Sequence, residues 1–220
     1  MKTRGMILFS GAVVLLLAAA SSYVATRLPI DAQAPIHWNA AGQIDGYADK
    51  WTALFIAPLM ALVTSLIFTA VSVAEPQQDN LAKSRALVTI AWFGMLGTAA
   101  VIEFAQVSTL FGWPVPVARL VVGGIGLFFI LLGNQLSKSR QMYMVGIRTP
   151  WTLADPDIWI ATHRLGGKLM MVAGLAWLVA AACGWVGPAS LPPLVAVMVT
   201  AGLVPVAYSY LLWRRLGRTS

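Results

Sequence analysis

The sequence has few charged residues and almost no cysteine, and both shortages exclude classes of protein. Charged side chains make up 10% of the 220 residues, whereas a soluble domain carries about 25%. The single cysteine, Cys183, allows no intramolecular disulfide and no cysteine-based metal site of the usual spacing. By contrast, 59% of the chain is apolar, so the chain is better counted in membrane spans than in soluble domains.

The apolar residues form six runs, each near the roughly 20 residues that a spanning helix needs. We place the spans at residues 5–24, 51–74, 86–111, 117–136, 168–185 and 194–213. Pro58 and Pro205 lie inside spans, where neighbouring helices can satisfy the backbone groups that proline frees. The predicted fold is an all-α, polytopic membrane bundle of six transmembrane helices.

The start of the chain also resembles a secretory signal peptide, because Lys2 and Arg4 precede an apolar run that contains Ala18, Ala19 and Ala20. That run continues to Val24 and is long enough to span. We therefore favour a first transmembrane helix over a cleaved signal peptide.

The basic residues predict the orientation. With the N-terminus in the cytoplasm, only Arg27, Lys50 and Arg119 face outside, and the positive-inside rule is obeyed. The other basic residues then face inside: Lys2, Arg4, Lys83, Arg85, Lys138, Arg140, Arg148, Arg164, Lys168, Arg214, Arg215 and Arg218. Both termini are predicted to be cytoplasmic. The net charge of +7 is explained by this bias, so we expect no direct contact with nucleic acid.

Two polar loops interrupt the apolar background, and they divide the chain. We expect an N-terminal two-helix unit, residues 1–75, with an ordered extracytoplasmic loop over 27–50. A four-helix unit, residues 86–220, follows, with a cytoplasmic loop over 133–167. The stretch 75–85 is interpreted as an ordinary solvated turn. No internal repeat of fixed period supports a transporter built of inverted repeats.

The outer loop combines aromatic faces with hydrogen-bonding groups, a mixture that suits peptide recognition. Asp45-Gly46 is a strong turn pair, so the loop is expected to be compact. The candidate ligand-binding residues are His37, Trp38, Asn39, Asp45, Gly46 and Tyr47. The alternative is that Trp38 and Tyr47 only anchor the loop at the lipid interface.

A metal site is not expected in this loop. Zinc sites usually need three or four ligands, mostly His or Cys, and the only other histidine, His163, is predicted to lie across the membrane. A single-histidine site that uses His37 with Asp45 or Asp49 is the remaining alternative. No cofactor is predicted.

In the inner loop, Asp155-Pro156-Asp157 is a good helix start, with Asp155 as N-cap and proline at the first position. A helix from there places Trp159, Thr162 and His163 on one face. The residues permit two interpretations: a docking surface, or an interfacial helix that meets anionic lipid headgroups.

The motifs of both loops resemble the SdpI family of membrane immunity proteins. The inner motif comprises Gly133-Asn134, Leu136, Lys138, Arg140, the run from Gly146 to Leu153, Trp159 and Thr162-His163-Arg164. The outer loop is similar to an N-terminal domain often fused to that family, in Leu28-Pro29, His37-Trp38-Asn39, Gly42, Asp45-Gly46-Tyr47 and Lys50. Gln141-Met142 stand where the family commonly has Pro-Asn, and Gln43 stands where Glu is common.

The resemblance implies a non-catalytic protein of the bacterial cytoplasmic membrane. Members protect the cell from a secreted sporulation-delaying peptide toxin, and the type member also holds a soluble transcriptional repressor at the membrane. The outer loop would then meet the secreted toxin. The inner loop would dock a cytosolic DNA-binding repressor, through Asn134, Lys138, Arg140, Arg148, Thr149, Trp151, Trp159, His163 and Arg164.

Glu103 is an ionisable residue inside the third span, which marks a functional candidate by default. It lies about 14 Å below the outer end at the rise of a helix, with Gln106 one turn on. We expect either an ion pair with Arg119 or a protonated acid bonded to Gln106. The alternative function is a small transporter or proton-coupled carrier that uses Glu103.

An enzyme has the least support, because no nucleophile, base and orienting group occur together on one side of the membrane. The best acid–base candidate, His163 with Asp155 or Asp157, lacks a nucleophile.

Overall fold

The computed structural model describes residues 3–216. Its helices and strands follow in this order: α1 (Thr3–Arg27), β1 (Gln33–Trp38), β2 (Ile44–Asp49), α2 (Lys50–Ala74), α3 (Gln78–Lys83), α4 (Arg85–Leu110), α5 (Val117–Leu136), α6 (Pro150–Ala154), α7 (Pro156–Cys183) and α8 (Leu191–Arg215). Six of these helices are long and apolar enough to cross a membrane. The predicted class, a polytopic helical bundle, is confirmed.

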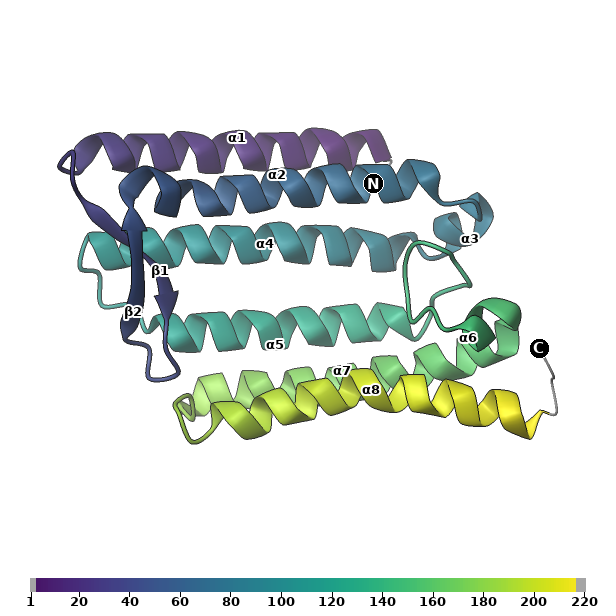
Figure 1. Cartoon of the computed structure of the whole chain (residues 1–220). Coiled ribbons are helices and arrows are strands. Elements are labelled where there is room, and N and C mark those ends of the chain that lie inside the picture. The colour runs from purple at the N-terminus through teal and green to yellow at the C-terminus, as the bar shows by residue number, and fades with distance from the viewer. Residues whose placement is uncertain (1–2, 217–220) are drawn as a thin grey trace.

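The long helices run side by side, with α1, α2 and α4 in one group and α5, α7 and α8 in the other (Figure 1). The β1–β2 hairpin lies across one end of the bundle, while α3 and α6 lie at the opposite end, where the described chain also begins and ends. Helix α4 contacts α1, α2 and α5. The hairpin end and the α3–α6 end correspond to the predicted outer and inner faces, and these names are kept below. The sidedness itself stays a prediction, as does the division into two units, and Lys2 and Arg218 lie outside the described residues.

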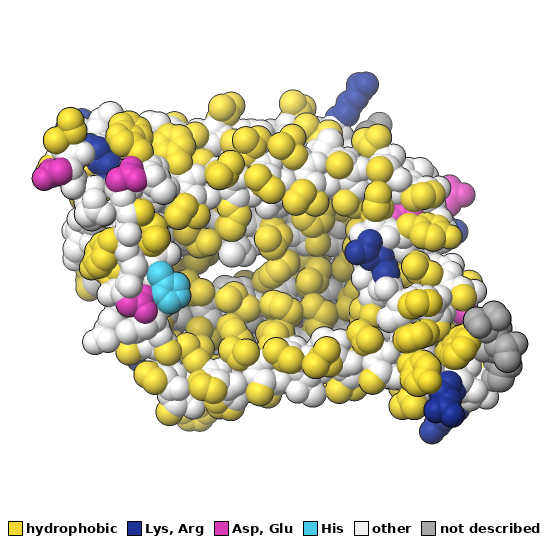
Figure 2. Space-filling view, in the orientation of Figure 1, with side chains coloured by type: hydrophobic (Ala, Val, Ile, Leu, Met, Phe, Trp, Pro, Cys, Tyr) yellow, Lys and Arg dark blue, Asp and Glu magenta, His cyan; other side chains and the backbone are white. Residues whose placement is uncertain are grey.

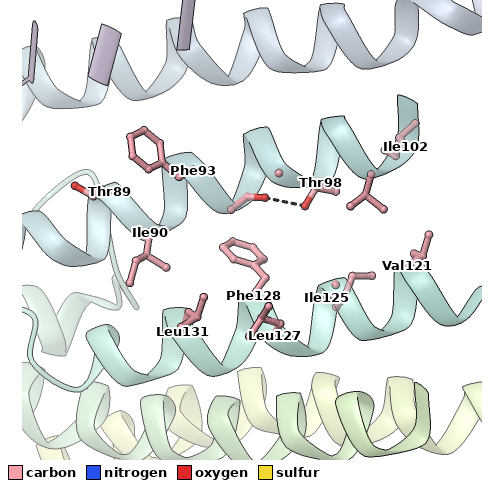
Figure 3. Close-up of a pocket in the computed structure, with 14 residues that line it drawn as sticks. Thr89, Ile90, Phe93, Thr98, Ile102, Val121, Ile125, Leu127, Phe128 and Leu131 are labelled. Carbon is pink, nitrogen blue, oxygen red and sulfur yellow. Dashed lines mark hydrogen bonds between the residues drawn. The ribbon is translucent and has the colours of Figure 1, made fainter. Parts of the chain in front are cut away.

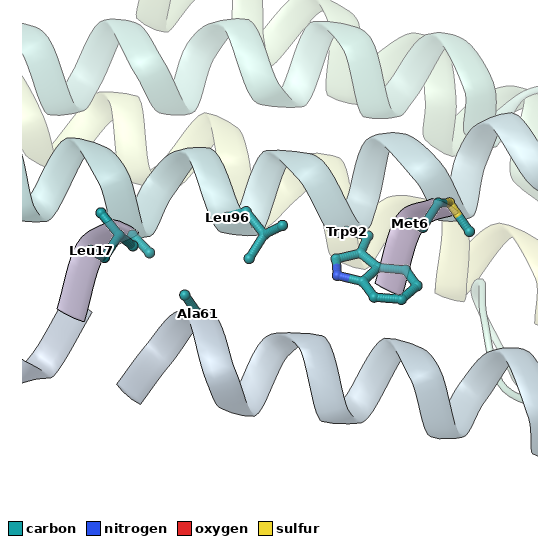
Figure 4. Close-up of a cluster of buried hydrophobic side chains, with 6 residues drawn as sticks. Met6, Leu17, Ala61, Trp92 and Leu96 are labelled. Carbon is teal, nitrogen blue, oxygen red and sulfur yellow. The ribbon is translucent and has the colours of Figure 1, made fainter. Parts of the chain in front are cut away.

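The surface is apolar along the middle of the bundle, and charged side chains gather near its two ends (Figure 2). This distribution matches a bilayer, in which the helix sides meet hydrocarbon and the ends meet water. Inside the first helix group, Met6, Leu17, Ala61, Trp92 and Leu96 form a buried cluster between α1, α2 and α4 (Figure 4). Because lipid tails are as apolar as leucine, such packing must hold the helices by shape and close contact.

Helices α5 and α7 approach most closely where glycines face each other. A Cβ atom built on Gly126 would lie 2.7 Å from the carbonyl oxygen of Gly174, and one on Gly133 would lie 2.6 Å from that of Gly167. The pairs are seven residues apart in both helices, so they recur on the same face. Glycine is required here because the two backbones touch.

The predicted fifth span begins too late. Helix α7 starts at Pro156, and it joins the predicted interfacial helix and the predicted span from Lys168 in one unbroken helix. Asp155 caps it, since its side chain accepts from the amides of Asp157 and Ile158. Helix α7 continues through Gly166 and Gly167. At these two positions the absence of a side chain allows α7 to lie against neighbouring elements.

Gly174→Ala is expected to lower the stability of the bundle by about 1–3 kcal/mol, because the new methyl group overpacks a backbone contact. Gly97→Ala is the matched control, since no atom lies within 4 Å of its Cβ position and alanine favours a helix by up to about 1 kcal/mol. Thermal unfolding in detergent measures both. Equal midpoints for the two variants would contradict the α5–α7 contact.

Candidate functional site

The outer loop forms an antiparallel hairpin, in which Ala34 pairs with Ala48 and Trp38 pairs with Ile44. Asn39 closes the turn, because its side-chain oxygen accepts from the amides of Ala41 and Gln43. Gly42 has a φ of 77°, a left-handed conformation that glycine adopts at low cost. The expected compact loop is therefore a hairpin, with its tip set by side-chain hydrogen bonds.

The hairpin presents an exposed His–Asp pair. His37 Nδ1 lies 2.5 Å from Asp45 Oδ1, and the two side chains are 68% and 45% exposed. Gly46 lies opposite His37, and a Cβ there would come 3.0 Å from the Cβ of His37. Tyr47 is exposed on the second strand. The structure thus brings together the predicted outer residues on one small hairpin.

Three polar side chains fix this hairpin to the bundle. The Gln106 amide of α4 donates to the carbonyl oxygens of Pro35 and Ala53, so one side chain joins β1 and α2 to α4. Lys50 is buried, and its ammonium donates to the carbonyls of Leu28 and Pro29. Asp49 caps α2, and hydrogen bonds from Thr52, first from its side chain, lower the pKa of the Asp49 carboxyl. The hairpin is therefore held at both strands.

A pocket of about 420 Å³ opens beside the hairpin tip, between the hairpin and the α4–α5 connection. Trp38 of the hairpin and Arg119 of α5 both line it. The Arg119 guanidinium lies close to Gly184, which ends α7 with a φ of 72°. An indole face, a cation and the hairpin tip thus border one cavity, and this cavity was not predicted from the sequence.

Glu103 does not pair with Arg119, so the predicted ion pair is wrong. The Glu103 carboxyl lies 2.8 Å from the hydroxyl of Ser21 on α1, and the one ion pair found among residues 3–216 is His37–Asp45. The predicted bond from Glu103 to Gln106 is also wrong, because Oε2 of Glu103 and Oε1 of Gln106 have no hydrogen-bond partner among residues 3–216, and the Gln106 amide donates to Pro35 and Ala53.

The stretch 75–85, predicted to be a solvated turn, is part of the inner site. Glu75 is 2% exposed, and its carboxylate accepts hydrogen bonds from the amides of Gln77, Tyr143 and Met144. Ser84 accepts from the amide of Arg140 at 2.8 Å. An irregular backbone at a membrane face needs such partners. The sequence signal for this site is a glutamate next to a proline at the end of a span. The polar composition of the stretch led instead to the prediction of a solvated turn.

His163 holds the same loop from the α7 side. Its Nε2 accepts from the amide of Ile147, and its Nδ1 lies 2.8 Å from the carbonyl of Trp159. Nδ1 must therefore carry the proton, and the ring is neutral. Trp159 stacks on His163 with ring centroids 3.9 Å apart. Gly146 fits against both rings, because a Cβ there would come 2.6 Å from Trp159.

Thr149 and Trp151 fasten helix α6 to α8. Thr149 caps α6 in a reciprocal pair with Thr152, and the Trp151 indole donates to the hydroxyl of Ser209. Trp151 also packs against Tyr210 and Trp213. Thr149 and Pro150 thus begin a short helix.

Burial corrects the predicted docking surface. Trp159 and His163 are fully buried and Thr149 is nearly so, so they support the loop and cannot meet a partner directly. Arg148 is exposed, but its guanidinium donates to the carbonyl of Tyr143. Four predicted residues remain exposed with their polar groups turned to solvent or to each other: Asn134, Lys138, Arg140 and Arg164.

Each of the two sites contains one histidine, and neither histidine is bonded to a nucleophile among the described residues. The exposed His37–Asp45 pair has no hydroxyl or thiol nucleophile bonded to it among the described hydrogen bonds, and both nitrogens of His163 are used by the backbone. Within residues 3–216, no group of three or more His, Cys, Asp or Glu side chains could hold a metal ion.

A separate groove of about 600 Å³ lies between α4 and α5, in the middle of the bundle. Its wall is mostly apolar, and both of its threonines already have partners: Thr98 donates to the carbonyl of Gly94 and Thr89 to the sulfur of Met6 (Figure 3). Phe128 reaches across from α5 toward α4. The groove offers no polar group to a ligand and is a surface for hydrocarbon.

Glu75→Gln is expected to loosen residues 140–147, because a charge-assisted hydrogen bond is about twice as strong as a neutral one. Hydrogen exchange of the Tyr143 and Met144 amides should accelerate at least several-fold. Asp79→Asn, an exposed neighbour on α3, is the control and should leave these amides unchanged. Equal exchange in the two variants would contradict the role given to Glu75.

Comparison with known proteins matches both halves of the chain. Residues 138–209 match the SdpI/YfhL protein family, and residues 12–62 match a domain of unknown function, DUF1648. The chain is 25% identical to the immunity protein SdpI of Bacillus subtilis (strain 168) over 182 residues, which cover 83% of this chain and 84% of that protein. No solved structure matches. The resemblance predicted from the sequence is confirmed: this multi-pass bacterial membrane protein matches the SdpI/YfhL family in its C-terminal part and the DUF1648 domain near its N-terminal end.

Proposed function

We propose that this protein is a non-catalytic immunity protein of the bacterial cytoplasmic membrane that protects its cell from a secreted peptide toxin. The similarity to an immunity protein over most of both chains carries the proposal. The hairpin supports the proposal, since a helical bundle does not need an ordered polar hairpin at one end in order to span a membrane.

The toxin-binding site that we propose is the hairpin tip with the adjoining pocket. Trp38 gives the pocket an aromatic wall, and aromatic side chains in pockets are frequent anchors of binding energy. Arg119 brings a cation that has no acidic partner among the described residues. A peptide that places an apolar or aromatic side chain against Trp38 and an anionic group near Arg119 fits this cavity.

His37 and Asp45 serve this site by shaping its rim. Their hydrogen bond joins the two strands near the turn, which limits the motion of the tip. A rim that is already ordered loses less entropy on binding. Asn39 acts in the same way, through its bonds across the turn.

For the inner face, the proposal is narrower than the sequence suggested. The exposed residues Lys138, Arg140 and Arg164 form the partner-facing surface, and Trp159 and His163 hold the loop that carries it. A cytosolic DNA-binding repressor with an acidic patch would suit such a surface. The same cations would also attract anionic lipid headgroups, so partner capture must be tested directly.

A small transporter is the alternative function, and Glu103 is the feature that favours it. Its carboxyl is buried and has a hydrogen bond to Ser21, but no acidic or basic side chain among residues 3–216 is bonded to it to continue a proton path. Flux through the unmodified protein in liposomes would support the carrier, and Glu103→Gln should then abolish it.

Expression of the protein in a toxin-sensitive bacterium is expected to raise survival when the cognate toxin is added, and Trp38→Ala should remove most of that protection. Loss of a well-buried aromatic anchor costs about 2 kcal/mol or more of binding energy, which is at least a tenfold shift in the protective dose. Colony counts over a toxin dilution series measure the shift.

Trp185→Ala is the matched control, because Trp185 is an exposed belt residue that does not line the pocket. Membrane abundance of each variant, measured by immunoblot, separates lost binding from lost protein. Full protection by Trp38→Ala, or no protection by the unmodified protein, would contradict the proposed site or the proposed function respectively.

Arg140→Ala combined with Arg164→Ala is expected to release a cytosolic DNA-binding partner that co-purifies with the unmodified protein in the presence of toxin. Arg4→Ala, at an exposed basic residue of the first helix, is the control for a general loss of charge. If no DNA-binding protein co-purifies with the unmodified chain, the signalling half of the proposal fails.

A further inference from the structure

Pro58 creates an unusual need inside helix α2. In a helix, the carbonyl of residue i accepts from the amide of residue i+4, and the partner of Leu54 would be Pro58, which has no N–H. Both residues are buried. A buried carbonyl without a donor costs free energy comparable to a lost hydrogen bond, so another element must supply the proton.

Ser21 of α1 supplies it. The Ser21 hydroxyl lies 2.8 Å from the carbonyl oxygen of Leu54 and is fully buried. The Ser21 hydroxyl oxygen also lies 2.8 Å from Oε1 of Glu103 on α4. A serine hydroxyl has one proton to donate and two lone pairs to accept with. The Leu54 carbonyl can only accept, so it takes the serine proton.

The contact between Ser21 and Glu103 then needs its proton from the glutamate. We propose that Glu103 is a neutral carboxylic acid that donates to Ser21, which in turn donates to the carbonyl that Pro58 leaves free. This chain of bonds joins α4, α1 and α2. With this assignment, each hydrogen bond of the network joins one donor to one acceptor.

The surroundings of Glu103 support the neutral form. The residue is 5% exposed, and its second oxygen, Oε2, has no hydrogen-bond partner among residues 3–216. A buried carboxylate with an unpaired oxygen is far more costly than a neutral acid in the same place. The cations at the hairpin end of the bundle do not pair with Glu103: Lys50 donates to Leu28 and Pro29, and Arg119 makes no ion pair among the described residues. Arg27, at the end of α1, lies over the ring of Tyr23.

The consequence reaches the outer hairpin. Gln106 lies one turn from Glu103 on α4, and it donates to Pro35 of the hairpin and to Ala53, the residue before Leu54. The Glu103 proton joins α4 to α1 and, through Ser21, to α2. Gln106 then joins the hairpin and α2 to α4 beside this network. Glu103 and Ser21 are therefore positioning residues for the proposed toxin site. This last step rests on the proposed function, whereas the protonation state does not.

Infrared difference spectroscopy of the full-length protein in lipid, at neutral pH, tests the protonation state. The spectrum is expected to contain a carbonyl band of a protonated carboxylic acid that disappears in Glu103→Gln and shifts in Ser21→Ala. Glu75→Gln is the control and should keep the band, because the Glu75 carboxylate accepts three amide bonds. A spectrum without such a band in the unmodified protein would overturn the proposal.

A double-mutant cycle tests the role of Pro58. Ser21→Ala is expected to lower the thermal midpoint, and to lower it much less in a Pro58→Ala background, where residue 58 regains an amide for Leu54. Ser22→Ala is the control, since Ser22 bonds to Ala18 of its own helix. Glu103→Gln should keep most of the midpoint because its amide can still donate, whereas Glu103→Leu should not. Additive effects of Ser21→Ala and Pro58→Ala, or equal losses in the two Glu103 variants, would overturn the network.

The two proposals fail in different ways. If the infrared band and the cycle behave as expected but the unmodified protein gives no protection from toxin, the proposed function fails and the protonated network stands. If protection is found but Glu103→Gln lacks any spectral change, the proposed function stands and the network fails.

Discussion

The structure depends on one constraint: a backbone group that is not paired within a helix must find a partner inside the membrane protein itself. At the hairpin, at the inner loop and at Pro58, a buried polar side chain from a long helix or its end supplies that partner. Gln106 holds the hairpin, Glu75 and His163 hold the inner loop, and Ser21 serves the carbonyl freed by Pro58. All four of these side chains are buried, and they hold the hairpin and the inner loop in fixed positions.

The two ends of the bundle satisfy the constraint differently, and this difference separates their proposed roles. At the inner end, the side chains of Glu75, Ser84 and His163 form their hydrogen bonds with the loop itself, and the exposed groups at its edge are mainly cations. At the outer end, the anchoring groups lie beneath the hairpin, and the His37–Asp45 pair, Trp38 and Tyr47 stay accessible. An accessible tip above a pocket suits a receiver of ligands, whereas a braced loop with a basic rim suits a platform.

Hydropathy was sufficient to find all six spans, because runs of about 20 apolar residues have few alternatives. Caps were also readable: Asp155 with Pro156 predicted the start of a helix that the structure confirms. The length of α7 was missed because Arg164 and Lys168 suggested a membrane surface, while the helix continues through them. The functions of Glu75 and Ser21 could not be read, since both depend on partners more than 30 residues away.

Pairing errors had a related origin. The ion pair between Arg119 and Glu103 was predicted because their charges are opposite and their spans are adjacent in the sequence. The directions of the side chains decide which groups meet, however. Glu103 faces α1 and α2, and Arg119 lies near the end of α7. The hydroxyl of Ser21, which accepts the Glu103 proton in the proposed network, thus takes the place that a cation was expected to fill, and the acid is neutral.

Helix α4 links the two ends. Near its outer end Gln106 bonds to the hairpin, and at its inner end Ser84 accepts from the amide of Arg140. Its contact with α5 is interrupted by the apolar groove, which Phe128 bridges at Gly94. A ligand that shifts the hairpin therefore acts on α4 through Gln106. The inner loop is displaced only to the extent that α4 moves as a rigid body. Coupling between the two faces requires a differential contact of this kind at both ends. Helix α4 makes contacts at both ends, and so does α2, which begins beside the hairpin and is followed by Glu75 at the inner loop.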